Sequence, residues 1–239
     1  MHYSYITYSN KGKRQRNEDS YFPKNGTNHN NLFFVCDGIG GHGDGDLASA
    51  FITDYLPAQL SQNQSFSEEI LVDSFKNTHT DLKRYAMQVG NLQMGSTIAL
   101  IKLNSTKGWV GWVGDSRIYH IRNGQVLFKS KDHSLFELML DNGKLSAEEA
   151  DNYSMKHIIY QALGTHGTAM NPSVAELKDI QEKDIFLLAS DGLFEAWSEE
   201  ELVDLLKNDS QASAKILYER CLQNSNDNFT FTIVKAVSA

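Results

Sequence analysis

The stretch STIALIKLNSTKGWVGWVGDSRIYHIRNGQVLFKS, residues 96–130, decides the fold class. It contains four short apolar runs rich in β-branched and aromatic residues, and turn residues separate each run from the next. Asn123-Gly124, between the last two runs, is the dipeptide that most favours a type I′ hairpin turn. Because such turns join neighbouring strands, the stretch predicts an antiparallel meander.

Outward from the meander, strands and helices alternate along the chain. Further strand-like runs lie at residues 2–9, 31–36, 184–190 and 228–237. Helical patterns lie at residues 46–60, 65–90, 134–160, 198–208 and 211–223. Because the strands cluster centrally and pairs of helices interleave with them, we expect an α+β fold of sheets covered by helical layers. No repeat or linker divides the sequence, which predicts a single domain over residues 1–239.

The composition excludes several classes of protein. Of the 239 residues, 41% are hydrophobic and 22% are charged, which is typical of a globular domain. A net charge of −8 offers no general attraction to nucleic acid or to an anionic membrane. Cys36 and Cys221 are too few for a disulfide framework, and the N-terminus carries neither a signal pattern nor a membrane-spanning run. We therefore expect a cytoplasmic protein.

A glycine-rich loop follows the strand-like run at residues 31–36. Gly38, Gly40 and Gly43 match the G-x-G-x-x-G spacing of a dinucleotide-binding loop. That kind of site also needs a second parallel strand and an acidic residue about 20 positions later. Here the corresponding window reads LSQNQSF and holds no acid. What remains is Asp37, an acid at the end of a buried strand, beside glycines that let the backbone approach closely.

Acidic residues recur where other strand-like runs begin or end. They are Glu18, Asp19, Asp37, Asp115, Asp191 and Asp227. Each alone is an ordinary turn or cap residue, but together they lie where open sheets gather ligands. Gathered carboxylates repel one another unless cations lie between them. Oxygen ligands favour Mg²⁺ or Mn²⁺, and no Cys/His spacing suits zinc. The acids therefore predict a metal site.

Eight short motifs give the chain a resemblance to the metal-dependent protein phosphatases of type 2C, in their compact bacterial form. In order along the sequence they read RQRNEDS, FFVCDGIGGHG, MGSTIAL, VGDSRIY, KDHSL, QALG, ASDGLFE and DNFTFTIV. The resemblance spans Arg14 to Val234, nearly the whole chain. It implies a sandwich of two antiparallel sheets flanked by pairs of helices (αββα), with a binuclear metal centre at one end.

The resemblance also implies roles for single residues. Asp37 would bridge two Mn²⁺ or Mg²⁺ ions, and the carbonyl of Gly38 would bind one of them. Asp191 and Asp227 would complete this site. Asp115, together with Asp191, would help to hold a third, weaker cation.

Residues before the second strand would contact water and substrate. By resemblance, Glu18 and Asp19 would contact waters bound to the metals, and Arg14 would bind the substrate phosphate. A guanidinium group offers the planar fork of donors that suits phosphate oxygens. If this segment is extended, Arg14 and Arg16 point to opposite faces and one of them faces the cleft.

The residue that protonates the leaving group is open. Many eukaryotic members carry His directly after the first Asp-Gly, whereas this sequence has Ile39. His42 is a candidate general acid, with a structural imidazole as the alternative. His133 is expected to support the fold. Residues 136–164 match the position of the family's flap, and their composition suits either a lid or two surface helices.

The leading hypothesis is a metal-dependent serine/threonine phosphatase. It would hydrolyse phosphoserine and phosphothreonine monoesters on proteins, using a water activated between two cations, and would oppose a bacterial Ser/Thr kinase. We expect a monomer with no nucleic-acid or membrane partner. One alternative is a two-metal phosphodiesterase, which the acidic charge disfavours. Another is a non-catalytic signalling module. The presence of all three expected metal ligands, Asp37, Asp191 and Asp227, disfavours it.

Overall fold

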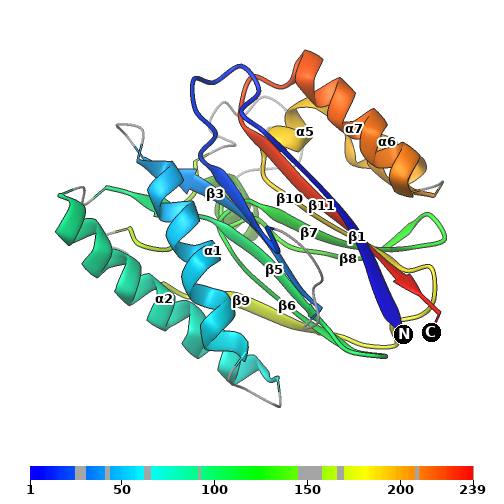
Figure 1. Cartoon of the computed structure of the whole chain (residues 1–239), viewed down its shortest axis with the longest axis horizontal. Helices are drawn as coiled ribbons and strands as arrows, with labels where there is room; N and C mark the ends of the chain where they lie inside the picture. The colour runs from blue at the N-terminus through cyan, green and yellow to red at the C-terminus, as the bar shows by residue number, and fades with distance from the viewer. Residues whose placement is uncertain are drawn as a thin grey trace.

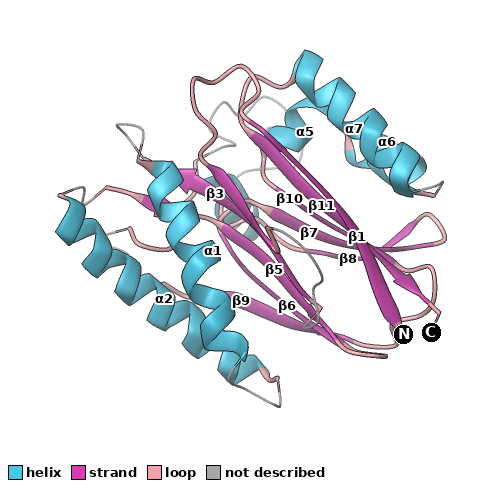
Figure 2. Ribbon diagram, viewed as in Figure 1, coloured by secondary structure: helices cyan, strands magenta, loops and turns pink. Residues whose placement is uncertain are grey.

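Two antiparallel β-sheets lie face to face, with helices on both outer faces (Figure 1). The computed structural model describes residues 1–24, 31–40, 44–61, 66–90, 93–144, 158–165, 170–207 and 210–238. Figure 2 shows the strands in the middle layers and the longer helices outside them. The α+β sandwich with helical outer layers is therefore confirmed.

The first sheet carries both ends of the chain. Its strands are β1 (His2–Asn10), β7 (Arg117–Arg122), β8 (Gln125–Lys129), β10 (Ile185–Ala189) and β11 (Phe229–Val237). Their spatial order is β1-β11-β10-β7-β8, and every neighbouring pair is antiparallel. Asn123 and Gly124, between β7 and β8, have φ angles of +50° and +73°. Positive φ at both central residues is the mark of a type I′ turn, so the predicted hairpin is confirmed.

The second sheet holds the first two of the four predicted meander strands. Its strands are β2 (Asp19–Phe22), β3 (Leu32–Ile39), β4 (Gly95–Ser96), β5 (Ile98–Leu103), β6 (Gly108–Val113) and β9 (Ser173–Leu177). The order is β2-β3-β5-β6-β9, with β4 paired to β3. Because the chain crosses to the first sheet between β6 and β7, the prediction of one continuous antiparallel meander is wrong: the stretch forms two antiparallel pairs in different sheets. Sequence patterns did not reveal β9. It is an edge strand whose side chains are mostly half-buried, so its hydrophobic alternation is weak.

Helices cover the outer faces of both sheets. They are α1 (Gly45–Ser61) and α2 (Glu68–Val89) over the second sheet, and α5 (Gly192–Ala196), α6 (Glu199–Leu206) and α7 (Ser210–Asn224) over the first. Short α5 was not predicted. In the expected helical region 134–160, the structure describes α3 (Leu135–Asp141), while residues 145–157 lie outside the described part. None of the described helices has the length and apolar character to cross a membrane.

Strand β3 shows how the sequence builds this layered core. Its run LFFVC is buried at every position, because both faces of the strand are covered. Phe33 and Val35 point between the two sheets, whereas Phe34 and Cys36 point toward α1 and α2. Truncating a fully buried Phe costs about 3–5 kcal/mol, so this strand is a strong anchor for the loop that follows it.

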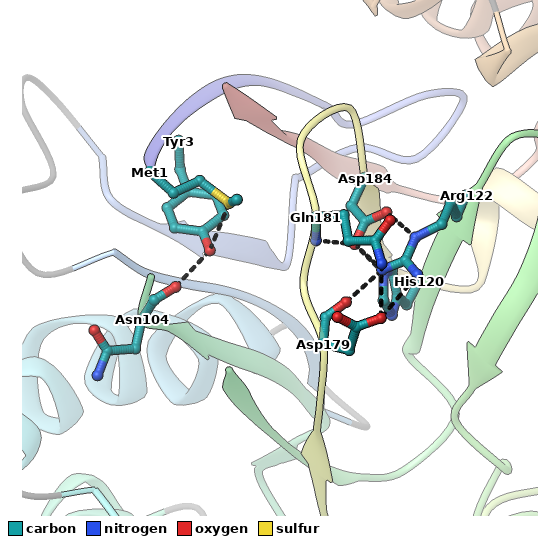
Figure 3. Close-up of polar contacts among 8 residues, drawn as sticks. All are labelled: Met1, Tyr3, Asn104, His120, Arg122, Asp179, Gln181 and Asp184. Carbon is teal, nitrogen blue, oxygen red and sulfur yellow. Dashed lines mark hydrogen bonds and ion pairs between the residues drawn. The ribbon is translucent and has the colours of Figure 1, made fainter. Parts of the chain in front are cut away.

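The antiparallel order separates two ends of the sandwich. β3 and β10 run toward one end, and Asp37 and Asp191 lie there. β11 starts at the same end, two residues after Asp227. The opposite end, where β10 begins and β7 finishes, holds Asp184 in a buried cluster with His120 (Figure 3). One end is therefore rich in acids and the other contains a paired charge cluster.

Candidate metal centre and phosphate site

A cavity of about 670 Å³ opens at the acidic end of the sandwich. Its lining comes from the loop after β1, from the end of β3 and from the residues before β11. The lining residues are Arg14, Gln15, Arg16, Glu18, Asp37, Gly38, Ile39, Gly40, Asp227 and Asn228. Four of the sequence-predicted site residues (Arg14, Glu18, Asp37 and Asp227) and the backbone of Gly38 therefore share one cavity.

Strand β3 brings Asp37 and Gly38 into the cavity. A Cβ atom at Gly38 would lie 2.0 Å from the carbonyl oxygen of Gly45 and 2.5 Å from that of Glu18. Real Cβ contacts are never this short, so only glycine lets the start of α1 and the residue before β2 approach β3 so closely. The backbone N–H of Gly38 donates to the carbonyl of Glu18 at 3.1 Å. Gly38 therefore serves close packing beside Asp37.

Asp19 lies directly across from Asp37 in the β2–β3 register. Its Oδ2 accepts a hydrogen bond from the Ser190 hydroxyl at 2.7 Å, whereas its buried Oδ1 has no hydrogen-bond partner within the described part of the chain. Burial raises the pKa of Asp19 to about 7, with a further contribution from the charges of Asp191 and Asp227, although the hydrogen bond from Ser190 acts in the opposite direction. An unpartnered buried carboxylate oxygen is costly and marks a place suited to a cation or an ordered water.

The other acids raise one another's pKa in the same way. Asp37 opens onto the cavity but is largely surrounded by protein, and this desolvation, with the charges of Asp19 and Asp191, raises its pKa well above the ordinary value. Burial, followed by the charge of Asp191, raises the pKa of Asp115 to about 7. Burial and nearby Asp46 raise the pKa of Glu18. The fold therefore brings the predicted acids within electrostatic reach of one another.

This donor set fits hard divalent cations. Carboxylates whose pKa values are raised by neighbouring acids are stabilised when positive charge lies between them, and among the described residues one oxygen of Asp19 has no hydrogen-bond partner. Within the described ranges, no three Asp, Glu, His or Cys side chains are already arranged as a closed metal site. Asp227, for one, is turned toward Arg14. A closed arrangement of these side chains around a cation would therefore need a change of side-chain direction.

Arg14 and Asp227 form a bidentate ion pair at the cavity. Arg14 Nε donates to Asp227 Oδ1 at 2.9 Å, and Arg14 Nη2 donates to Oδ2 at 2.7 Å. The premise of an extended segment is wrong, because residues 12–16 form turns and bends, with the Arg14 N–H donating to the carbonyl of Lys11. In a turn, side chains do not alternate between two faces, so Arg14 and Arg16 both line the cavity.

Asn228 is a site residue that the sequence reasoning missed. Its side-chain amide donates to the carbonyls of Lys11 and Arg16, both at 2.8 Å, and its Oδ1 accepts from the N–H of Glu18 at 2.8 Å. These three bonds tie the loop that carries Arg14 to the start of β11. The only sequence signal was its place directly after Asp227 in the DNFTFTIV motif.

The two histidines singled out from the sequence, His133 and His42, differ in what the structure shows of them. His133 is buried, and its Nδ1 accepts from the N–H of Gly114 at 3.2 Å while its Nε2 contacts Ser173 Oγ at 2.9 Å. Burial lowers the pKa of His133 to about 4, so it is neutral at neutral pH and acts as a structural residue, as expected. His42 lies outside the described residues, so its proposed role as a general acid is a prediction still.

Comparison with known proteins supplies the family. The family model for protein phosphatase 2C matches residues 5–138, more than half of the chain. The chain belongs to the protein phosphatase 2C family. This phosphatase is 30% identical to the serine/threonine phosphatase stp of Listeria welshimeri over 231 residues, which cover 93% of this chain and 91% of the relative.

Solved structures of serine/threonine phosphatases share the fold of this chain. The phosphatase superposes on the serine/threonine phosphatase PstP/Ppp of Mycobacterium tuberculosis with a TM-score of 0.86 and 26% identity, covering 99% of both chains. It also matches the catalytic domain of PstP in complex with two manganese ions, with a TM-score of 0.82, 27% identity and 99% coverage of both chains. The phosphatase is thus a serine/threonine protein phosphatase of a metal-dependent family, which confirms the leading hypothesis over the phosphodiesterase and the non-catalytic module.

Proposed function

We propose that Asp37, the Gly38 carbonyl, Asp191 and Asp227 hold two Mn²⁺ or Mg²⁺ ions with which this chain hydrolyses phosphoserine and phosphothreonine. When bound, such cations supply a Lewis acid that lowers the pKa of water and offsets phosphoryl charge. The observation that carries the proposal is the crowding of acids beside a cavity of about 670 Å³: burial and the charge of neighbouring Asp191 raise the pKa values of Asp19, Asp37 and Asp115.

Arg14 binds the substrate phosphate in this proposal. Its guanidinium now engages both carboxylate oxygens of Asp227, and the same planar fork matches two phosphate oxygens. Arg14 is 59% exposed, so it can turn from Asp227 toward a phosphate in the cavity. Asp227 then has Oδ2 released for a cation, while its Oδ1 still accepts from the N–H of Asn228 at 2.8 Å. Arg14 thereby orients the phosphoryl group for in-line attack by water.

Three further acids support this site. Glu18 lines the cavity and Asp19 lies beside it with one unpartnered oxygen, so both are suited to accept hydrogen bonds from water. Asp115 is the ligand proposed for a third, weaker cation, because Asp191 is near enough for its charge to raise the pKa of Asp115. We also propose that residues 1–239 act as one catalytic domain, as a monomer, on phosphoproteins made by a bacterial Ser/Thr kinase.

Release of phosphate from a phosphothreonine peptide tests the metal assignment. With Mn²⁺ present, the wild type is expected to release phosphate, and Asp37→Ala and Asp191→Ala are expected to lose this activity. Calorimetric titration with Mn²⁺ should show weakened binding in both variants. Wild-type rates and wild-type Mn²⁺ affinity in either variant would contradict the assignment of that residue.

The phosphate assignment is tested on Arg14, with Arg16 as its matched control. Arg14→Ala removes two charge-assisted hydrogen bonds to phosphate, each worth about 1.5–3 kcal/mol, so KM for the phosphopeptide should rise about tenfold or more. Mn²⁺ binding should survive, because Asp227 is only freed by the change. Arg16→Ala removes the same charge from the same loop and is expected to change KM less than threefold. Equal effects of the two variants would show that only the loop's charge matters.

A further inference from the structure

Thr97 lies between two segments that each carry a predicted metal ligand. It follows β4 and precedes β5, and it is 1% exposed. On one side it contacts Asp37 in β3, and on the other it contacts the turn that holds Asp115. None of the sequence motifs assigned it a role beyond its place in MGSTIAL.

Toward β3, Thr97 bonds both polar backbone groups of Asp37. The N–H of Thr97 donates to the Asp37 carbonyl at 2.9 Å, and the N–H of Asp37 donates to Thr97 Oγ1 at 3.0 Å. The hydroxyl of Ser96 adds a second donor to the same carbonyl at 2.9 Å. A residue whose backbone is held at both groups has little freedom to rotate, so these bonds fix the direction in which the Asp37 side chain leaves the backbone.

Toward the other segment, Thr97 contacts the turn between β6 and β7. Its hydroxyl lies 2.6 Å from the hydroxyl of Ser116, which is also 1% exposed and directly follows Asp115. Gly114 has a φ of +99°, and a Cβ there would lie 2.5 Å from Thr97 Cγ2. The methyl group of Thr97 therefore packs against Gly114 while its hydroxyl bonds Ser116, and Asp115 lies between these two contacts.

We propose that Thr97 is a positioning residue that sets the placement of Asp37 relative to Asp115, and so couples the main cation pair to the third cation site. The proposal rests on the proposed function, because it takes both aspartates as metal ligands. The Thr97 hydroxyl is the shared element, since it accepts from the Asp37 N–H and bonds the Ser116 hydroxyl. A side chain with the same shape but no hydroxyl would leave both partners unsatisfied in the interior.

Three variants test this role. Thr97→Val keeps the shape and removes the hydroxyl, and Thr97→Ser keeps the hydroxyl and removes the methyl group. Thr232→Val is the matched control, because Thr232 is also fully buried and its hydroxyl also bonds one other hydroxyl, that of Thr7 at 2.9 Å, in the first sheet. For each variant, melting temperature, Mn²⁺ affinity by calorimetry, and kcat and KM on a phosphothreonine peptide are measured.

Thr97→Val is expected to lower both Mn²⁺ affinity and kcat about tenfold, with KM for the peptide within twofold of the wild type. Thr97→Ser should recover both values to within about threefold. Thr232→Val should lower the melting temperature while leaving Mn²⁺ affinity and kcat unchanged. If Thr97→Val lowers only the melting temperature, as Thr232→Val does, Thr97 is merely structural and the proposal is overturned.

Ser116→Ala provides a milder variant should Thr97→Val fail to fold. It removes the bond toward Asp115 but leaves the bonds between Thr97 and Asp37. The Mn²⁺ concentration that half-activates the enzyme should rise about threefold, while the tight Mn²⁺ binding seen by calorimetry is unchanged. Wild-type Mn²⁺ dependence of activity in Ser116→Ala would overturn the coupling.

Asp37→Asn, measured alongside, separates this proposal from the proposed function. If Asp37→Asn binds Mn²⁺ as tightly as the wild type, the metal site itself is wrong and both proposals fail. If Asp37→Asn loses Mn²⁺ while folded Thr97→Val keeps wild-type affinity and kcat, only the role of Thr97 fails.

Discussion

The two ends of the sandwich treat buried acids in opposite ways. At one end, Asp184 is fully buried and accepts hydrogen bonds from Arg122 Nε and Nη2, His120 Nε2 and the N–H of Gln181, at 2.6–2.9 Å (Figure 3). Burial raises its pKa, but the bonds from Arg122 and His120 outweigh burial and hold the pKa well below the ordinary value. At the other end, burial and neighbouring acids raise the pKa of Asp37.

The difference separates an acid that stabilises the fold from acids that prepare a site. Asp184 receives its compensating charge from Arg122, a side chain of the same chain. Asp19 raises the pKa of Asp37, the charges of Asp191 and Asp227 raise that of Asp19, and one oxygen of Asp19 has no hydrogen-bond partner among the described residues. At the Asp184 end, the protein supplies the compensating positive charge from its own side chains. At the Asp37 end, where we expect cations to bind, that positive charge would come from the bound cations.

The largest effect is expected from Asp37→Asn. It should abolish phosphopeptide hydrolysis, and in a chelating buffer at pH 8 it should raise the melting temperature, because one of several repelling carboxylates is gone. Each kcal/mol gained corresponds to about 2–4 °C in a domain of this size. Mn²⁺ at 100 times its Kd should stabilise the wild type by about 2.7 kcal/mol and the variant far less. A lower melting temperature for the chelated variant would contradict the comparison.

Asp184→Asn should destabilise the fold, whereas Asp37→Asn should stabilise it in the chelating buffer. It leaves Arg122 and His120 without their buried carboxylate, so the free energy of unfolding should fall by about 3 kcal/mol, measured by urea denaturation. Turnover at 25 °C should be unchanged, because the cluster lies at the end away from the cavity. Asp179→Asn is the matched control: Asp179 pairs with the same Arg122 at 3.4 Å but is 75% exposed, so its loss should cost less than about 1 kcal/mol. Equal costs for the two variants would refute the argument from burial.

Lowering the pH should give a smaller effect, a loss of the stabilisation that Asp184 provides. The folded pKa of Asp184 is depressed, so its contribution is fully present above the ordinary pKa of about 3.9 and is lost as the pH falls through that value toward the folded pKa. The stability gap between wild type and Asp184→Asn should therefore be constant from pH 7 to 5 and shrink below pH 4, by at most about 1.4 kcal/mol per pH unit. Urea denaturation at each pH measures the gap, and a gap that stays constant to pH 3 would contradict this sign.

Much of the fold could be predicted because its signals are local. The Asn123-Gly124 turn and the buried run of β3 are short patterns with a direct physical cause. Strand β9 was not predicted because it is a half-buried edge strand, and helix α5 was not predicted because it has only five residues. Such elements are held by packing against their neighbours more than by their own sequence pattern.

The candidate site divides in the same way. Acids at strand ends were visible in the sequence, because residue type and position within a strand-like run are local features. The partners that hold them were not. Ser190 bonds Asp19 across 171 positions of the chain, and Asn228 bonds the carbonyl of Arg16 across 212. No local pattern records a contact between residues so far apart.

The sequence by itself determined most of the strands, the acids at their ends and, through its motifs, the family. Only the tertiary structure decided which acids are left without compensating charge. Asp37 and Asp184 are both acids beside apolar runs. Antiparallel pairing brings Arg122 and His120 to Asp184, and brings Asp19 to Asp37. Because the pKa of a buried carboxylate depends on the charges that surround it in space, its role follows from the fold.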